Sequence, residues 1–175
     1  NNSFGYTSNN TFYSSIISGT IEDCVAGNNS FGHGVNTTSL ISGKIKGCTG
    51  LNYCFGYGLT NAEISGNIED CSAVNWGYGF AGAYAGTVLI SGKIKRCTGV
   101  IRCFGFVSVV GNSVLSGLLE DCIEGSELFA TTSSTGVIRR CSSPVLYHPQ
   151  SGTIDSCVFV SEYPSVILKN GAKLT

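Results

Sequence analysis

The chain has 175 residues, of which 42% are hydrophobic and only 12% are charged, and its formal net charge is −1. This apolar content is too high for a disordered chain. Because there is no basic excess to hold a phosphate backbone, a nucleic-acid partner is not expected. No apolar run approaches the roughly 20 residues that cross a bilayer, so no membrane span is expected either.

In chain order, the first element is the short motif Phe4-Gly5-Tyr6, and the next is a strand-like segment that ends at Cys24. This segment occurs seven times, and its cysteines are 24, 23, 26, 25, 19 and 16 residues apart. Each copy has glycine five positions before the cysteine, Ser or Thr before that glycine, and Ile or Leu three positions before the cysteine. The aligned cysteines are Cys24, Cys48, Cys71, Cys97, Cys122, Cys141 and Cys157. Agreement of three columns over seven units identifies an internal repeat.

The aromatic motif recurs about seven residues after the cysteines. Its further copies are Phe31-Gly32-His33, Phe55-Gly56-Tyr57, Trp76-Gly77-Tyr78, Phe104-Gly105-Phe106 and a degraded Phe129-Ala130. Periods of this length are typical of leucine-rich repeats or β-solenoids, and no leucine-rich consensus is present. Apolar residues lack the 3.6-residue spacing of a helix, and glycine within nearly every segment disfavours helices further.

The repeat therefore predicts an all-β fold, a right-handed parallel β-helix of about seven coils of 16–26 residues. Residues 1–175 form one domain in this interpretation, either a processed chain or a segment of a longer repeat protein.

The position two before each cysteine alternates in charge through all seven units. This column is Glu22, Lys46, Glu69, Lys95, Glu120, Arg139 and Asp155. The next column partly echoes it, with Asp23, Gly47, Asp70, Arg96, Asp121 and Arg140. Equivalent residues of stacked coils lie about 4.8 Å apart. At that separation like charges are destabilising, whereas opposite charges stabilise by roughly 0.2–1 kcal/mol per pair. The alternation predicts that each coil lies directly on the next.

Residues 30–48 and 54–71 resemble repeats in surface proteins of bacteria and phages, which are similar to the pectin-lyase-like superfamily of right-handed β-helices. The resemblance covers residues 3–157. It implies an extracellular, cell-surface or virion location. That fold is used by fibres, adhesins, tailspikes and polysaccharide-cleaving enzymes, so the resemblance does not specify an activity.

Carboxylates two coils apart are the first candidates for chemistry. Glu22, Glu69 and Glu120 would be separated by roughly 9.6 Å, at the edge of the ~6.5–9.5 Å span of inverting glycosidases. Lys46 and Lys95 between them favour the ionised form, which is unsuitable for a general acid. The charge column is therefore interpreted as structural, with no catalytic residue and no enzyme expected. A polysaccharide lyase or glycoside hydrolase is the alternative.

The nine cysteines allow two interpretations. Neighbouring cysteines of the aligned column would have Cα atoms about 4.8 Å apart, within the ~4.4–6.8 Å range of disulfides. They also suit a buried ladder of free thiols. Cys54 and Cys103 belong to a separate column. No cofactor or metal is expected, because paired CxxC spacing is lacking and His33 and His148 are the only histidines.

The aromatic column suggests a core, or a binding surface if it points outward. Its members are Phe4, Phe31, Phe55, Trp76, Phe104 and Phe129. An outward orientation would make four neighbours the expected glycan contacts. These are Tyr6, His33, Tyr57 and Tyr78.

The leading hypothesis is a non-catalytic structural module of an extracellular fibre, appendage or virion surface, which assembles with copies of itself as a filament or trimer. The alternatives are a glycan-binding adhesin or tail-fibre domain and, with less support, a polysaccharide depolymerase. Head-to-tail stacking would place Asp155 against Glu22, unless an eighth coil presented Lys169 or Lys173.

Overall fold

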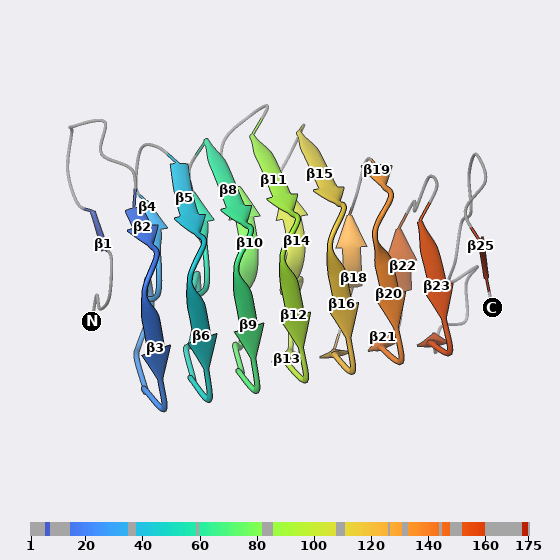
Figure 1. The fold of residues 1–175 in the computed structure, drawn as a ribbon, viewed down its shortest axis with the longest axis horizontal. Coiled ribbons are helices and arrows are strands. Elements are labelled where there is room, and N and C mark those ends of the chain that lie inside the picture. The colour runs from blue at the N-terminus through green and yellow to red at the C-terminus, as the bar shows by residue number, and fades with distance from the viewer. Residues whose placement is uncertain are drawn as a thin grey trace.

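The computed structural model describes residues 6–7, 15–34, 38–58, 60–81, 86–107, 111–125, 127–130, 133–143, 145–147, 152–159 and 173–174. Every regular element in these ranges is a β-strand, and the strand pairings are parallel. The strands stack along one long axis as a β-solenoid (Figure 1). The predicted all-β parallel β-helix is therefore confirmed.

Two adjacent sheets carry the segment before each cysteine. The first has the order β19-β15-β11-β8-β5-β2. Its strands are β2 (Ser15–Ile17), β5 (Thr38–Ile41), β8 (Asn61–Ile64), β11 (Thr87–Ile90), β15 (Asn112–Leu115) and β19 (Ser133–Ser134). The second has the order β25-β23-β20-β16-β12-β9-β6-β3. Its strands are β3 (Thr20–Glu22), β6 (Lys44–Lys46), β9 (Asn67–Glu69), β12 (Lys93–Lys95), β16 (Leu118–Glu120), β20 (Val137–Arg139), β23 (Thr153–Asp155) and β25 (Lys173–Leu174).

The segment after each cysteine forms the rest of the coil. A short sheet consists of β13 (Thr98–Gly99), β17 (Ile123–Glu124), β21 (Ser142–Ser143) and β24 (Val158–Phe159), and single bridges extend it from Thr98 back to Val25. A five-stranded sheet consists of β1 (Tyr6–Thr7), β4 (His33–Gly34), β7 (Tyr57–Gly58), β10 (Tyr78–Ala81) and β14 (Phe104–Val107). β18 (Glu127–Ala130) pairs with β22 (Val145–Tyr147).

The coil is right-handed. Strands such as β16 and β20 run downward on the near side, and β18 between them runs upward on the far side, while the chain advances from left to right (Figure 1). The second sheet has eight strands, one more than the seven predicted coils. β25 places Lys173 opposite Thr153, two positions before Asp155, so Lys173 does not continue the alternating column. Lys169 lies outside the described residues.

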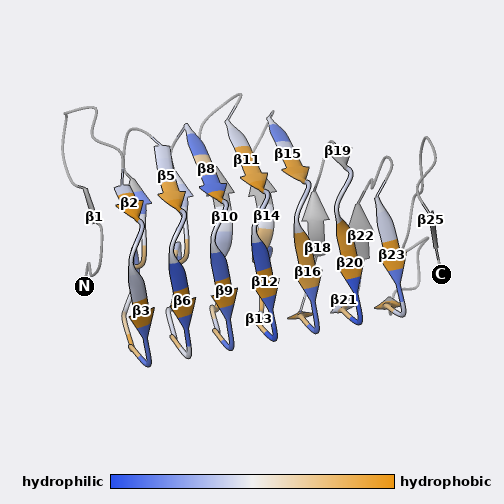
Figure 2. Ribbon diagram, in the orientation of Figure 1, coloured by the Kyte–Doolittle hydropathy of each residue, from blue (hydrophilic) through white to orange (hydrophobic). Residues whose placement is uncertain are grey.

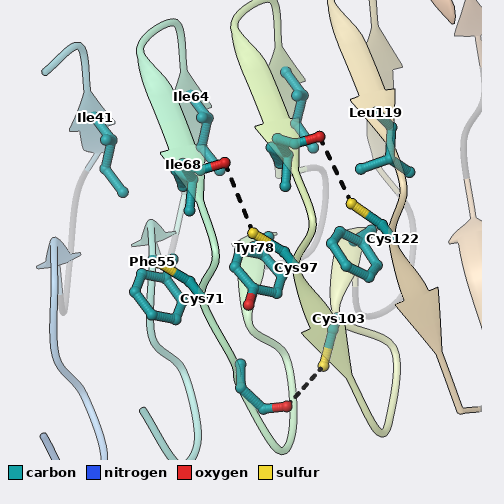
Figure 3. Close-up of a cluster of buried hydrophobic side chains, with 14 of the residues drawn as sticks. Ile41, Phe55, Ile64, Ile68, Cys71, Tyr78, Cys97, Cys103, Leu119 and Cys122 are labelled. Carbon is teal, nitrogen blue, oxygen red and sulfur yellow. Dashed lines mark hydrogen bonds between the residues drawn. The ribbon is translucent and has the colours of Figure 1, made fainter. Parts of the chain in front are cut away.

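The core lies inside the coils and consists of stacked columns. In the middle coils the isoleucine three positions before the cysteine is fully buried, as are the cysteine itself and an aromatic ring. Figure 3 shows the rings of Phe55 and Tyr78 next to each other in successive coils, near Cys71, Cys97 and Ile68. Each of the middle coils therefore contributes the same kinds of apolar side chain at equivalent positions. As a result, the core is continuous along the solenoid.

The glycine five positions before the cysteine lies at a corner where successive backbones approach closely. A Cβ atom on Gly66 would lie 2.0 Å from the carbonyl oxygen of Gly43, and one on Gly92 would lie 2.0 Å from that of Gly66. Both obstacles are main-chain atoms, which cannot move aside as a flexible side chain could. Glycine is needed here because no larger residue fits between the coils.

A second corner directly precedes the cysteine and has a left-handed backbone. Asp23, Asp70, Arg96 and Asp121 have φ between 51° and 55°, and Gly47 occupies the same position with φ of 63°. Aspartate and glycine tolerate this conformation better than most residues. The corner turns the chain from the eight-stranded sheet into the short one.

Candidate functional site

The alternating charge column lies on the outward side of the eight-stranded sheet. Strand register places each member opposite a residue of the opposite sign, in the order Glu22, Lys46, Glu69, Lys95, Glu120, Arg139 and Asp155. Because successive side chains of a strand point to opposite faces, the buried isoleucines and these charges alternate. The column is therefore an inter-coil feature of the solenoid surface.

Glu120 has more ion-pair partners than any other member of this column among the described residues. Its carboxylate accepts from Lys95, with 2.6 Å between Nζ and Oε2, and from Arg140, with 2.7 Å between a guanidinium nitrogen and Oε1. Arg139 also forms an ion pair with Oε1. The hydrogen bond from Lys95, with those from Arg140 and Arg139, lowers the pKa of Glu120 to about 2. Glu120 is only 5% exposed, so these cations hold a nearly buried carboxylate in its ionised form.

The row of residues at the left-handed corner forms ion pairs of its own. The Arg96 guanidinium contacts Asp70, with 2.6 Å between Nε and Oδ1 and 3.1 Å between a terminal nitrogen and Oδ2. Arg140 contacts Asp121 in the same bidentate way. The arginine partners lower the pKa of both Asp70 and Asp121.

The first coil is paired differently. Glu22 lies opposite Lys46 in the register, yet its ion pair is with Lys44, with 3.3 Å between Nζ and Oε1. Lys44 lies two residues away along the strand, so the contact runs diagonally. Both side chains are 41% exposed or more, which makes the pair weak.

Glu120, Asp70 and Asp121 lack the raised pKa of a general acid. Catalytic acids in glycosidases have raised pKa values, whereas the shifts at Glu120, Asp70 and Asp121 are all downward. Within the described ranges, no three His, Cys, Asp or Glu side chains lie close enough to hold a metal ion.

All nine cysteines lie in the described part of the chain, and all are free thiols. Of the two interpretations of the cysteine column, the structure has the thiol ladder. Cys97 donates to the carbonyl oxygen of Ile68 in the preceding coil at 3.7 Å, and Cys122 donates to that of Ile94 at 3.6 Å (Figure 3). In the separate column, burial raises the pKa of Cys54 to about 11 and, together with the charge of Glu124, that of Cys103 to about 12. Thiols with raised pKa values are poor nucleophiles, which favours a packing role.

The aromatic column points inward, but one member differs from the prediction. The stacked rings are Phe31, Phe55, Tyr78 and Phe104, with centroids 4.7–5.0 Å apart. Tyr78, not Trp76, occupies the third place, because Tyr78 pairs with Phe104 in the strand register. The alignment of Trp76-Gly77-Tyr78 with the other motifs was therefore wrong by two residues, since Tyr78-Gly79-Phe80 fills the same place. Phe4 lies outside the described residues, as does the side chain of Phe129.

Tyr78 must consequently be removed from the expected glycan contacts, because its side chain is fully buried in the core. His33 is only 5% exposed, and burial lowers its pKa to about 4. Its ring stacks on Tyr57 with centroids 4.4 Å apart. Only the backbone of Tyr6 is described, opposite His33.

A second aromatic cluster, not predicted from the sequence, lies outside the core. Tyr53 stacks on Trp76 with centroids 4.9 Å apart, and its ring meets the edge of Tyr57 at 5.0 Å. All three are partly exposed. An amide ladder adjoins them, in which Asn75 donates to Asn52 at 2.7 Å and Asn52 donates to Asn28 at 2.8 Å. The signal in the sequence was the recurrence of Asn-aromatic pairs four and five positions after the cysteine.

A ridge of exposed aliphatic side chains was also missed. Its members follow the cysteine by one, three or four positions. They are Val25, Leu51, Val74, Val100, Ile101, Ile123 and Val158. We call this set the aliphatic ridge. The only other large hydrophobic residue exposed in the described ranges is Ile16.

The chain matches no protein-family model, no curated protein and no solved structure. The resemblance to surface and phage repeat proteins stays a prediction. Among the described residues, no helix has the length and apolar character needed to cross a membrane.

Proposed function

We propose that the chain is a non-catalytic structural module, a rigid β-solenoid spacer of an extracellular fibre, appendage or virion surface. The observation that carries this proposal is the continuity of its inner columns. Isoleucine, cysteine and aromatic side chains each contact their counterparts in the next coil, from Phe31 to Phe104 in the aromatic stack. Bending or extending such a rod requires many equivalent contacts to break.

The electrostatics support a non-catalytic role. Glu120 has three cationic partners, and Asp70 and Asp121 each have a bidentate arginine. These partners hold the coils in register and keep the carboxylates ionised, so the charged groups serve the stack. The location outside the cell rests on the resemblance of the repeats. Burial of Cys54 and Cys103 is compatible with it, because a shielded thiol with a raised pKa resists oxidation.

Single-molecule pulling between the two termini tests the spacer role. A spacer is expected to resist extension and then to open cooperatively in one or a few large steps. Continuous lengthening at low force would contradict the proposal. The Ile68→Ala variant provides a matched comparison, because it removes one link of an inner column and is expected to lower the opening force. Incubation with neutral and acidic polysaccharides is expected to release no reducing ends, and their release would contradict the non-catalytic role.

A second candidate function is glycan binding at the outer aromatic cluster. The observation that favours it is the position of Tyr53, Tyr57 and Trp76 beside the ladder of Asn52 and Asn75, since sugar recognition combines aromatic rings with amides. However, Tyr53 and Trp76 cover each other's faces, with an interplanar angle of 7°. A sugar would reach mainly ring edges.

A glycan array of the intact chain and its Trp76→Ala variant tests this second candidate. Binding that is lost in the variant would establish an adhesin role. The matched control is Ile16→Ala, which changes an exposed side chain away from the cluster. Absence of binding to any glycan would remove this candidate and leave the spacer role in place.

A further inference from the structure

The aliphatic ridge runs along one edge of the solenoid. At this edge the chain passes from the eight-stranded sheet through the short sheet and on towards the five-stranded sheet. Figure 1 shows β13 and β21 at the lower edge, and Figure 2 shows orange, hydrophobic segments along that edge. Among the described residues, seven of the eight exposed large hydrophobics belong to this edge. Val25 is 84% exposed and Ile123 is 55% exposed.

The fold itself does not require apolar residues at the positions of Val25 and Ile123. Val25 and Ile123 share one column with Thr49, Ser72 and Thr98, which make the same bridges between coils. The packing of the chain itself therefore accepts a polar residue in this column as well as an apolar one. An exposed apolar strip of this kind on a soluble surface marks an interaction site.

In the middle coils one column of the ridge is unbroken. Leu51, Val74 and Val100 occupy the same position in three successive coils, and their backbones are hydrogen-bonded in sequence at 2.9 Å and 3.2 Å. Ile101 adjoins Val100, and Ile123 belongs to the next coil. Ile123 belongs to the column of Val25, two positions earlier in the coil. Together these five residues extend over four successive coils, and the midpoint of that span lies between the coil of Val74 and that of Val100.

The charged corner beside the ridge indicates which partner fits it. This row runs parallel to the ridge and alternates in sign from Asp70 to Arg96, Asp121 and Arg140. In an antiparallel pair of solenoids the two rows lie on the same side of the joined ridges and face each other. A two-fold axis at the midpoint of that span places Asp70 opposite Arg96 of the second copy. It also places Asp23 opposite Arg140 of that copy.

Other arrangements use the same surface less well. A two-fold axis through a coil, instead of between coils, would bring like charges together. A parallel pair would place the two charged rows on opposite sides of the ridge, where neither row meets the other. The antiparallel arrangement alone combines contact between Val74 and Val100 with complementary charge.

We propose that the aliphatic ridge is a lateral interface, through which two copies of this chain pair antiparallel about a two-fold axis between the coils of Val74 and Val100. This inference rests on the proposed structural role and specifies how the module assembles. It replaces trimerisation and head-to-tail stacking as the expected mode of self-association.

Sedimentation equilibrium of the full chain over a concentration series tests the interface. A dimer is expected, and the double variant Val74→Asp/Val100→Asp is expected to weaken dimerisation more than about tenfold, since it buries four unpaired acids. The control is Ile16→Asp, which adds an acid at an equally exposed aliphatic residue outside the ridge. Circular dichroism and the melting temperature establish that each variant is folded.

Cross-linking distinguishes the antiparallel pair from a parallel one. A mixture of Val74→Cys and Val100→Cys chains, treated with a short thiol cross-linker and analysed by mass spectrometry, is expected to give a link between positions 74 and 100. Predominant linkage of position 74 to position 74 would overturn the antiparallel geometry.

Three further results would overturn the proposal. The chain could remain monomeric at all concentrations, it could dimerise equally well with both ridge aspartates present, or it could bind phosphatidylcholine vesicles through the ridge without dimerising. None of these results affects the pulling experiment, so failure of the interface and failure of the spacer role are distinguishable.

Discussion

The first coil and the middle coils have the same sequence motif but different environments. Ile21 is only partly buried, whereas Ile68 is fully buried at the same position. Glu22 forms one exposed ion pair, whereas Glu120 is nearly buried among three cations. Gly19 has no atom within 4 Å of a hypothetical Cβ. The comparison teaches that the motif encodes contacts with the preceding coil, so a residue's contribution depends on its place in the stack.

The largest difference between these regions is expected at the glycine corner. Gly66→Ala would place a methyl group 2.0 Å from a backbone oxygen, and we expect it to destabilise the chain by about 3 kcal/mol or more. Gly19→Ala meets no obstacle and is expected to change stability by less than about 1 kcal/mol. Urea unfolding of both variants measures the contrast. Equal destabilisation would show that close approach of the coils is not the reason for glycine.

A smaller contrast is expected in the isoleucine column. Ile68→Ala removes a fully buried side chain between two coils and is expected to cost about 2–5 kcal/mol. Ile21→Ala is expected to cost less than half as much, because its side chain already contacts solvent. Chemical denaturation of both variants with the same probe tests this. Similar losses would mean that the first coil is covered as fully as the middle ones.

The charge column should show the same dependence on position. Glu120→Gln leaves Lys95, Arg139 and Arg140 without their shared carboxylate and is expected to cost about 1–3 kcal/mol at neutral pH. Glu22→Gln is expected to cost less than about 1 kcal/mol because its ion pair is exposed. Thermal unfolding of the two variants and of the unsubstituted chain measures the two losses of stability.

The pH dependence sharpens the charge comparison. Because the folded pKa of Glu120 is lowered to about 2, its contribution is fully present above the unfolded pKa of about 4.3 and is lost as pH falls towards 2. The stability difference between the wild-type chain and Glu120→Gln should therefore shrink between about pH 5 and pH 2. A difference that stays constant over this range would contradict the ionised, cation-bound carboxylate.

The smallest effect concerns thiol reactivity. Cys24 in the first coil is partly exposed, whereas Cys71 in the third is 2% exposed. Iodoacetamide should label Cys24 well before Cys71 in the native chain, as followed by peptide mass spectrometry, and both should react alike after unfolding. Equal labelling rates in the native chain would show that the middle coils open as readily as the first.

Several parts of the structure could be predicted because the repeat expresses them directly. The charges of Glu22, Lys46 and Glu69 have a physical reason to alternate only if equivalent residues of successive coils lie next to each other. The charge pattern therefore predicts both the fold and the register. The buried isoleucines follow from the alternation of side chains along a strand. The burial of Tyr78 in the core could not be predicted, because Trp76-Gly77-Tyr78 and Tyr78-Gly79-Phe80 both match the aromatic-glycine pattern. Only strand pairing distinguishes the two alignments.

The sequence by itself determined the repeat, the parallel β-helix and the matching of charges between coils, because each of these depends on identical positions recurring at a nearly constant interval. The tertiary structure alone decided which ring enters the core and why the corner needs glycine. It also decided that the thiols stay unpaired and that Val74 and Val100 form part of one exposed ridge. These properties depend on how side chains turn and how closely backbones approach around each coil, and the spacing of residues along the chain does not contain that information.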